Sequence, residues 1–298
     1  MADGIDMQHR FFQSTLRSKQ RRTLLGALPL LGLTSLGFTR TAFAQEPPQP
    51  VFGTPGKDAG WIPTPNGMVE SMLRLANTSS SDVVADLGSG DGRIPILAAK
   101  TFGSRGLGIE LNGDLVKYSQ REAEKEGVAE RVRFVQGDIF ETDFSNATVI
   151  TLFMPPVVLK RLRPQLLTMK PGTRVLSYLF AMDDWDPDAW THMEGTHGML
   201  WIVPGSAGGT WKVDATAPDG EALGARLQQR VQKIEGKFLF GGRELPLYDT
   251  RLEGDRLKFT GLVGQRRFDF NGALKGDAYE GQLHVTGQPS RPFKATRS

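Results

Sequence analysis

The sequence of 298 residues contains no cysteine and only four histidines. The absence of cysteine excludes disulfides, thiolate nucleophiles and thiolate metal ligands. Only His192 and His197 lie close together in the sequence, so we expect no metal site. Asp183, Asp184 and Asp186 form an acidic cluster that could bind a metal, although a solvated loop is the more ordinary explanation.

The chain also lacks an excess of one charge outside its N-terminus. The formal net charge is +3, but residues 1–44 hold six basic and two acidic residues, which leaves 30 basic and 31 acidic residues elsewhere. Nucleic-acid binding needs clustered Lys and Arg that replace counterions. We therefore expect no nucleic-acid partner.

The N-terminus has an apolar run, Leu24–Phe38, that is shorter than the roughly 20 residues needed to span a bilayer. A segment with four basic residues, residues 17–22, precedes this run, and Ala42-Phe43-Ala44, a small-x-small cleavage site, follows it. This pattern predicts an export signal over residues 1–44 and a periplasmic or secreted protein with no stable membrane anchor after cleavage.

The pair Arg21-Arg22 resembles the twin-arginine signal, which exports folded proteins. Two alternatives stay open: an uncleaved membrane anchor, or a wrongly assigned start codon. If the signal is not used, the protein would be cytoplasmic or membrane-associated. Residues 45–57 are rich in proline near their start and are interpreted as a linker.

The main functional signal is a short strand, residues 82–87, that runs into a glycine loop and then an apolar helix, residues 94–101. This arrangement points backbone N–H groups and a helix N-terminus at a ligand. A dinucleotide site has the spacing G-x-G-x-x-G, but here Gly92 comes one residue early and Arg93 takes the later position. Asp86 would repel a pyrophosphate and suits the ammonium of an amino acid. The pattern therefore favours S-adenosyl-L-methionine over NAD and disfavours a nicotinamide oxidoreductase.

Two further acids follow the next two strands. A strand over residues 106–110 ends in Glu110, whose carboxylate can accept both ribose hydroxyl protons. A strand over residues 132–135 leads to Asp138, which can accept from the adenine amino group, while Ile139 packs on the ring. Ligands bind at the carboxyl ends of strands in open α/β sheets, so these acids predict one cofactor site.

These motifs, Asp86–Arg93 with Glu110-Leu111-Asn112 and Gly137-Asp138, resemble class I S-adenosylmethionine-dependent methyltransferases. More narrowly, they resemble the group of the mitochondrial ATP synthase c-subunit lysine N-methyltransferases and their bacterial relatives. The resemblance covers residues 58–204 and implies a Rossmann-like α/β sheet with helices on both faces. The predicted cofactor-binding residues are Asp86, Leu87, Gly88, Ser89, Gly90, Asp91, Gly92, Glu110, Leu111, Asn112, Asp138 and Ile139.

The resemblance also indicates where the methyl acceptor would lie. A fourth strand, residues 147–153, ends in Met154-Pro155-Pro156, and in class I folds this strand end faces the methyl group. Many amino-methylating enzymes carry Asn/Asp-Pro-Pro-aromatic there, and Met154 and Val157 depart from that pattern, which weighs against base methylation. The sequence names no catalytic residue. Candidates for the pocket wall, for which simple packing is the alternative, are Trp61, Thr64, Met154, Pro155 and Phe180.

Residues 205–298 change character, with glycine-rich turns between short alternating runs. We expect five or six strands in a small antiparallel β domain, either a meander or a partial barrel. It could bind the substrate protein, cap the cofactor site or mediate dimerisation; the sequence carries no signal for the oligomeric state.

The combined prediction is an S-adenosylmethionine-dependent methyltransferase that acts on a protein lysine or a small amine. The alternative is an exported, non-catalytic binding protein on the same fold.

Overall fold

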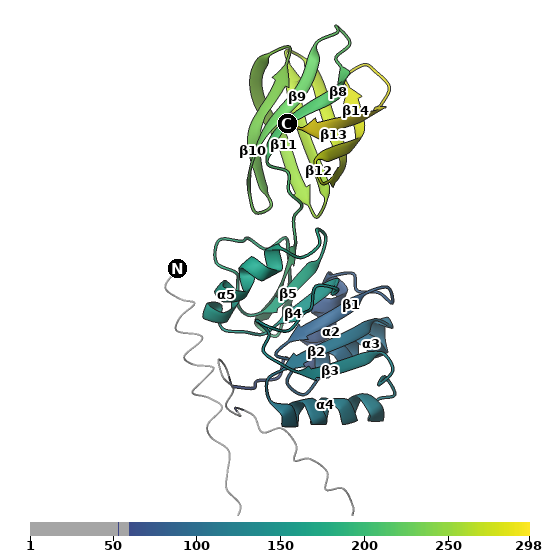
Figure 1. Cartoon of the computed structure of the whole chain (residues 1–298), viewed down its shortest axis with the longest axis vertical. Coiled ribbons are helices and arrows are strands. Elements are labelled where there is room, and N and C mark those ends of the chain that lie inside the picture. Colours follow the sequence, from purple (N-terminus) through teal and green to yellow (C-terminus); the bar gives the residue numbers. More distant parts are fainter. Residues whose placement is uncertain (1–52, 54–59) are drawn as a thin grey trace, which may run out of the picture. The chain divides into compact units, whose positions relative to one another are not determined.

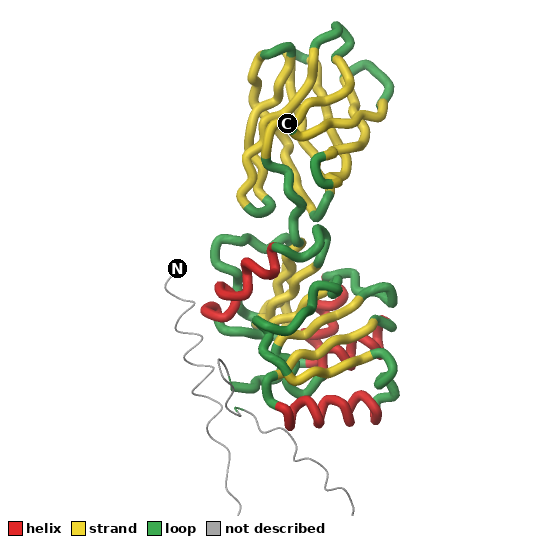
Figure 2. The backbone as a smooth tube through the Cα atoms, in the orientation of Figure 1, coloured by secondary structure: helices red, strands yellow, loops and turns green. Residues whose placement is uncertain are grey.

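A computed structural model describes residue 53 and residues 60–298 of the protein. The predicted export signal (1–44) and most of the predicted linker (45–57) lie outside the described residues. Within residues 60–298, no helix is both long enough and apolar enough to cross a membrane. Figure 1 and Figure 2 show two kinds of architecture along the chain, first alternating strands and helices and then strands alone.

The first part is a seven-stranded sheet with the strand order β3-β2-β1-β4-β5-β7-β6. Strands β1 to β5 are parallel, whereas β7 runs antiparallel to β5, and β6 antiparallel to β7. The order reverses between β1 and β4, where open α/β sheets form their ligand crevice. The strands are β1 Val83–Leu87, β2 Arg105–Glu110, β3 Val132–Gln136, β4 Val149–Leu152, β5 Arg174–Tyr178, β6 Ala189–Met193 and β7 Thr196–Ile202.

Helices cover both faces of this sheet, which confirms the predicted Rossmann-like fold class. They are α2 Asn66–Leu75, α3 Arg93–Phe102, α4 Gly113–Lys125 and α5 Pro156–Leu167. Helices α2, α3 and α4 bury their apolar residues on one face. Helix α5 repeats apolar residues at helical spacing, including Val158, Leu162 and Leu166, and these pack on the opposite face. Strand β6, at the sheet edge, was not predicted.

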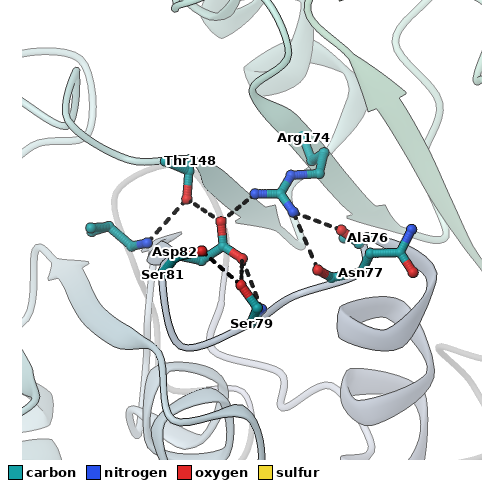
Figure 3. A network of polar contacts seen from close by, with 8 residues as sticks. Ala76, Asn77, Ser79, Ser81, Asp82, Thr148 and Arg174 are labelled. Atoms are coloured by element: carbon teal, nitrogen blue, oxygen red, sulfur yellow. Dashed lines mark hydrogen bonds and ion pairs between the residues drawn. The ribbon is translucent and has the colours of Figure 1, made fainter.

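A polar clasp joins the amino ends of β1, β4 and β5 (Figure 3). The buried carboxylate of Asp82 pairs with Arg174 and accepts a hydrogen bond from Thr148 Oγ1 at 2.7 Å. The Ser79 N–H donates to the same carboxylate at 2.8 Å, and Arg174 donates to the Ala76 carbonyl at 2.8 Å. The clasp therefore fixes the ends of three strands opposite the edge that carries the predicted site.

The second part is a closed barrel of antiparallel strands. Its interior is filled by aromatic side chains, among them Trp211, Phe238, Phe268 and Tyr279, each at most 1% exposed. The strands are β8 Gly209–Thr216, β9 Ala222–Arg230, β10 Lys233–Phe240, β11 Arg243–Glu253, β12 Arg256–Val263, β13 Arg266–Lys275, β14 Ala278–Val285 and β15 Arg291–Arg297.

The predicted small antiparallel β domain is confirmed, but the predicted number of strands and the open form are wrong. The chain makes eight strands that close on themselves. From the sequence, residues 227–234 are expected to form one of these strands, but they span a turn at Val231, which adopts φ +53° without the help of glycine or proline. Strand β11 was missed because Pro246 and its many charged residues hide the alternation.

Candidate functional site

The loop between β1 and α3 turns on three glycines with left-handed backbones. Gly88, Gly90 and Gly92 have φ of +78°, +54° and +77°, a region that residues with a Cβ avoid. The Gly88 N–H donates to the Ile109 carbonyl at 2.8 Å, which ties the loop to β2. A Cβ on Gly90 would lie 2.2 Å from Trp61 Nε1. The loop therefore needs glycine both for its turn and for a close approach from above.

Glu110, at the end of β2, is held by two backbone N–H groups. One carboxylate oxygen accepts from Gly90 at 2.9 Å and the other accepts from Asn112 at 2.9 Å. Each oxygen keeps a second lone pair, so the carboxylate can still accept two ribose hydroxyls. The sequence predicted a ribose contact but not the bond to Gly90. Through this bond, a ribose at Glu110 has a set position relative to the glycine loop.

Asp86, at the end of β1, is a buried carboxylate with one strong partner. It is 4% exposed, and Thr151 Oγ1 donates to it at 2.6 Å from the neighbouring strand β4. The pKa of Asp86 is raised to about 7, chiefly by burial and also by the charges of Asp91 and Glu110, against the lowering effect of the Thr151 bond. A bound ammonium would favour the ionised form, which suits the amino-acid end of S-adenosylmethionine.

Asp91 was predicted to contact the cofactor, but its carboxylate is engaged by Arg93. Arg93 Nη2 lies 2.6 Å from Asp91, and Arg93 Nη1 donates to the Thr64 carbonyl at 3.2 Å. This tie holds the segment before α2 against the glycine loop, where Trp61 lies over Gly90. Thr64, a predicted wall residue, is buried. The sequence did not indicate this role for Arg93.

Leu111 and Asn112, the other two residues predicted at this strand end, make different contacts from each other. The Asn112 side chain caps α4 by accepting from the Asp114 N–H at 2.9 Å. Leu111 is 44% exposed and offers an apolar side chain at the same edge. The backbone N–H of Asn112, rather than its side chain, donates to Glu110.

The predicted adenine contacts lie after β3. Asp138 accepts from the Phe140 N–H at 3.0 Å, which turns the chain at the strand end. Ile139 is buried in the core beside Phe140, and Arg161 stacks on the Phe140 ring with its guanidinium carbon 3.6 Å from the ring centroid. These contacts fix the loop on which Asp138 lies.

Leu87 and Ser89 can offer only backbone atoms to a cofactor. Leu87 is 1% exposed in the core. The Ser89 hydroxyl is buried, has no partner in the described part of the chain, and lies 2.7 Å from where a Cβ of Gly108 would be. The hydroxyl therefore faces β2 rather than the open edge.

The predicted acceptor-side residues follow β4 and β5. Met154 lies against the glycine loop, because a Cβ on Gly88 would be 2.1 Å from the Met154 methyl carbon. Pro155 is half-buried and is the N-cap of α5, while Val157 is 74% exposed. Phe180 is half-buried after β5. The structure thus brings Met154 to the predicted cofactor loop.

The acidic cluster after β5 makes ion pairs. Asp183 lies 3.8 Å from Lys160, and Asp184 pairs with Arg163. Among residues 60–298, no three His, Cys, Asp or Glu side chains gather as a metal site would require. The structure therefore offers no support for a metal at Asp183, Asp184 and Asp186.

Comparisons with known proteins find methyltransferases. Residues 86–189 match the family model of the ANTKMT methyltransferase domain. A protein-lysine N-methyltransferase of Saccharolobus islandicus is 43% identical over 129 residues, which are 43% of this chain and 80% of that protein. The ATP synthase c-subunit lysine N-methyltransferase of Xenopus laevis is 36% identical over 129 residues, which are 43% of this chain and 56% of that protein.

A crystal structure described as an RNA methyltransferase from Salinibacter ruber, in complex with S-adenosyl-L-homocysteine, is 49% identical to the aligned part. It covers 49% of this chain and 95% of that one, with a TM-score of 0.48. The cofactor of this chain is S-adenosylmethionine, which the glycine loop, Glu110 and Asp86 fit. The chain belongs to the S-adenosylmethionine-dependent methyltransferases, in the family of the ANTKMT methyltransferase domain.

Proposed function

We propose that the protein methylates the side-chain nitrogen of a lysine in a protein acceptor. The main support is the 43% identity to the protein-lysine N-methyltransferase of Saccharolobus islandicus, of which the chain spans 80%. The ATP synthase c-subunit relatives also bear the name of lysine N-methyltransferases, and the chain spans little more than half of the Xenopus laevis protein. The acceptor of this chain is therefore proposed as a protein lysine without a named protein.

The edge beside the glycine loop suits a neutral amine. S-adenosylmethionine supplies a sulfonium-bound methyl group, which the nitrogen lone pair accepts as the carbon–sulfur bond breaks, and the product ammonium then releases its proton to water. Met154 and Pro155 offer no acid or base, and an amine that arrives neutral requires none. What the chain must do is hold the nitrogen in line and keep water away.

Two other acceptors are less well supported. The Salinibacter ruber relative is described as an RNA methyltransferase. Here, however, residues 45–204 hold 20 acidic and 15 basic residues, a formal net charge of −5, which is unfavourable for a phosphate backbone. A small amine would also fit the chemistry. The non-catalytic alternative is not supported, because the related proteins are enzymes.

We further propose that the protein acts after export, with residues 1–44 removed. The motifs of the N-terminal signal support this location. N-terminal sequencing of protein from fractionated source cells tests it: a mature start at Gln45 in the exported fraction is expected. An intact N-terminus in the cytoplasm would place the reaction there.

Methyl transfer can be tested with tritiated S-adenosylmethionine. The purified chain is incubated with an extract of its source cells, and protein and RNA are then separated. We expect label in protein, on lysine by mass spectrometry, and much less of it with Glu110→Ala at a cofactor concentration below the wild-type Kd. Label confined to RNA would refute the lysine proposal while leaving the methyltransferase assignment intact.

A further inference from the structure

The sheet order divides the carboxyl edge into two halves. Asp86, Glu110 and Asp138 lie at the ends of β1, β2 and β3, which places the cofactor on that half. The amino-acid end belongs at Asp86, so its reactive end lies at the reversal between β1 and β4. An acceptor must then approach over the ends of β4 and β5.

An aromatic cluster lies at those two strand ends. The ring of Phe153, just after β4, meets Tyr178 edge-on with 4.8 Å between centroids. The same ring stacks with Phe180 at 6.1 Å and an interplanar angle of 21°. Phe153 and Phe180 are half-buried, so this cluster keeps part of its surface open.

Tyr178 carries a polar group that this cluster leaves without a partner. Tyr178 is 4% exposed, and its hydroxyl makes no hydrogen bond to any residue in the described part of the chain. Tyr279, also buried but in the barrel, donates from its hydroxyl to the Leu257 carbonyl at 2.9 Å. The Tyr178 oxygen itself reaches the surface of the described part of the chain, unlike the Ser89 hydroxyl, which is buried without a partner. A hydroxyl that is accessible at this strand end and has no partner among the described residues is available to a ligand.

The backbone after Tyr178 is strained and firmly held. Leu179 adopts φ +66°, which a residue with a Cβ rarely does, and its N–H donates to the His197 carbonyl at 3.0 Å. The buried Ser177 hydroxyl donates to the Phe180 carbonyl at 2.7 Å. Strain of this kind persists where the surroundings fix it, and it gathers at functional sites. Here the conformation of Leu179 turns the chain so that the ring of Phe180 packs on the ring of Phe153.

We infer that Phe153, Tyr178 and Phe180 bind the side chain of the acceptor lysine, with the Tyr178 hydroxyl accepting a hydrogen bond from its amine. This inference rests on the proposed function. The rings pack against the methylene stem of a lysine whose amine is neutral. A hydroxyl that accepts one amine hydrogen leaves the nitrogen lone pair free for the reaction. Tyr178 is thus assigned as the residue that selects an amine over an apolar group.

Calorimetric binding of two probes tests this assignment without an identified acceptor. Both are S-adenosylhomocysteine analogues with nitrogen in place of sulfur. One carries a 2-(butylamino)ethyl arm, and the other carries an all-carbon arm of equal length. We expect the wild-type chain to prefer the amine arm by about tenfold, the worth of one hydrogen bond. In Tyr178→Phe this preference should fall below about threefold, with unchanged affinity for S-adenosylhomocysteine.

Tyr248→Phe, the same loss of a hydroxyl on the exposed face of β11, is the matched control and should keep the full preference. Phe180→Leu should weaken both probes alike, because it removes a packing surface and no hydrogen bond. A wild-type chain without preference, or a Tyr178→Phe variant that keeps it, would overturn the assignment. Label on RNA instead of lysine would overturn the proposed function, whatever the probes show.

Discussion

Thr151 Oγ1 lies 2.6 Å from a carboxylate oxygen of Asp86, and the two residues are register partners on the parallel strands β4 and β1. The bond joins the strand that carries the cofactor acid to the strand that leads to the acceptor side. Both side chains are buried. A residue outside the glycine loop therefore favours the ionised form of Asp86, against the larger effect of burial.

Cofactor affinity should depend on pH through Asp86. Its pKa is raised to about 7, mainly by burial, and the ammonium of the cofactor needs the ionised carboxylate. Between pH 6 and pH 8 the ionised fraction rises about tenfold, and affinity should rise with it. Calorimetric titration at fixed ionic strength measures this. Asp86→Asn, the matched control, should bind weakly at both pH values, and a flat wild-type profile would contradict the assigned role.

The raised pKa of Asp86 should make cofactor affinity rise with pH but make the stability of the folded chain fall with pH. The folded chain binds a proton at Asp86 more tightly than the unfolded chain does, so this carboxyl lowers the free energy of unfolding as pH rises from about 4 to 7. In denaturant unfolding without cofactor, the free energy of unfolding should therefore fall less between about pH 4 and pH 7 in Asp86→Asn than in the wild type.

Glu110 variants should separate ribose binding from loop support. Glu110→Ala removes the acceptor for the N–H groups of Gly90 and Asn112 as well as for the ribose. We expect about thirtyfold weaker S-adenosylmethionine binding, or about 2 kcal/mol, and a lower melting temperature. Glu110→Gln keeps one of the two acceptor oxygens. It should therefore lose less cofactor affinity and less melting temperature than Glu110→Ala. Unchanged affinity in a folded Glu110→Ala sample would remove Glu110 from the site.

The sequence predicted much of the sheet because each of its main signals is local. Strand β1 is a short apolar run, and the glycine spacing after it marks a turn with left-handed backbones. In the barrel the turn at Val231 has no glycine, and β11 has Pro246. From the local sequence, a turn is not expected at Val231 and a strand is not expected around Pro246. Both form because each strand of the closed barrel pairs with its neighbours.

Within the site, the acids could be placed from sequence but their partners could not. Asp86 and Glu110 stand at predicted strand ends, which is a local property. Thr151 is one polar residue in the apolar strand Val149–Leu152, a detectable anomaly, but its partner depends on strand order. The bond from Arg93 to Thr64 links residues 29 apart, and no spacing rule indicates it.

The clasp at the amino edge should be a main source of stability. Arg174→Met leaves the buried Asp82 carboxylate without its cation and should lower the free energy of unfolding by about 3 kcal/mol. Burial raises the pKa of Asp82, but hydrogen bonds from Thr148, Arg174 and Ser79 outweigh it and the net pKa is lowered. The Asp82 contribution is thus present above about pH 4 and is lost as pH falls further. Urea unfolding at pH 7 and pH 3 should show the difference between wild type and Arg174→Met shrinking in acid.

Strain at Leu179 can be measured with a matched pair of variants. Leu179→Ala and Leu179→Gly both remove a side chain that packs against the core on one face of the sheet, but only glycine relieves the φ of +66°. Leu179→Gly should therefore be more stable than Leu179→Ala by about 1 kcal/mol in urea unfolding. If the strain holds Phe180 for the acceptor, Leu179→Gly should bind the amine-arm probe more weakly than Leu179→Ala despite its greater stability. Equal stabilities would show that the turn stores no strain, and stronger probe binding by the glycine variant would show that the strain does not serve the acceptor site.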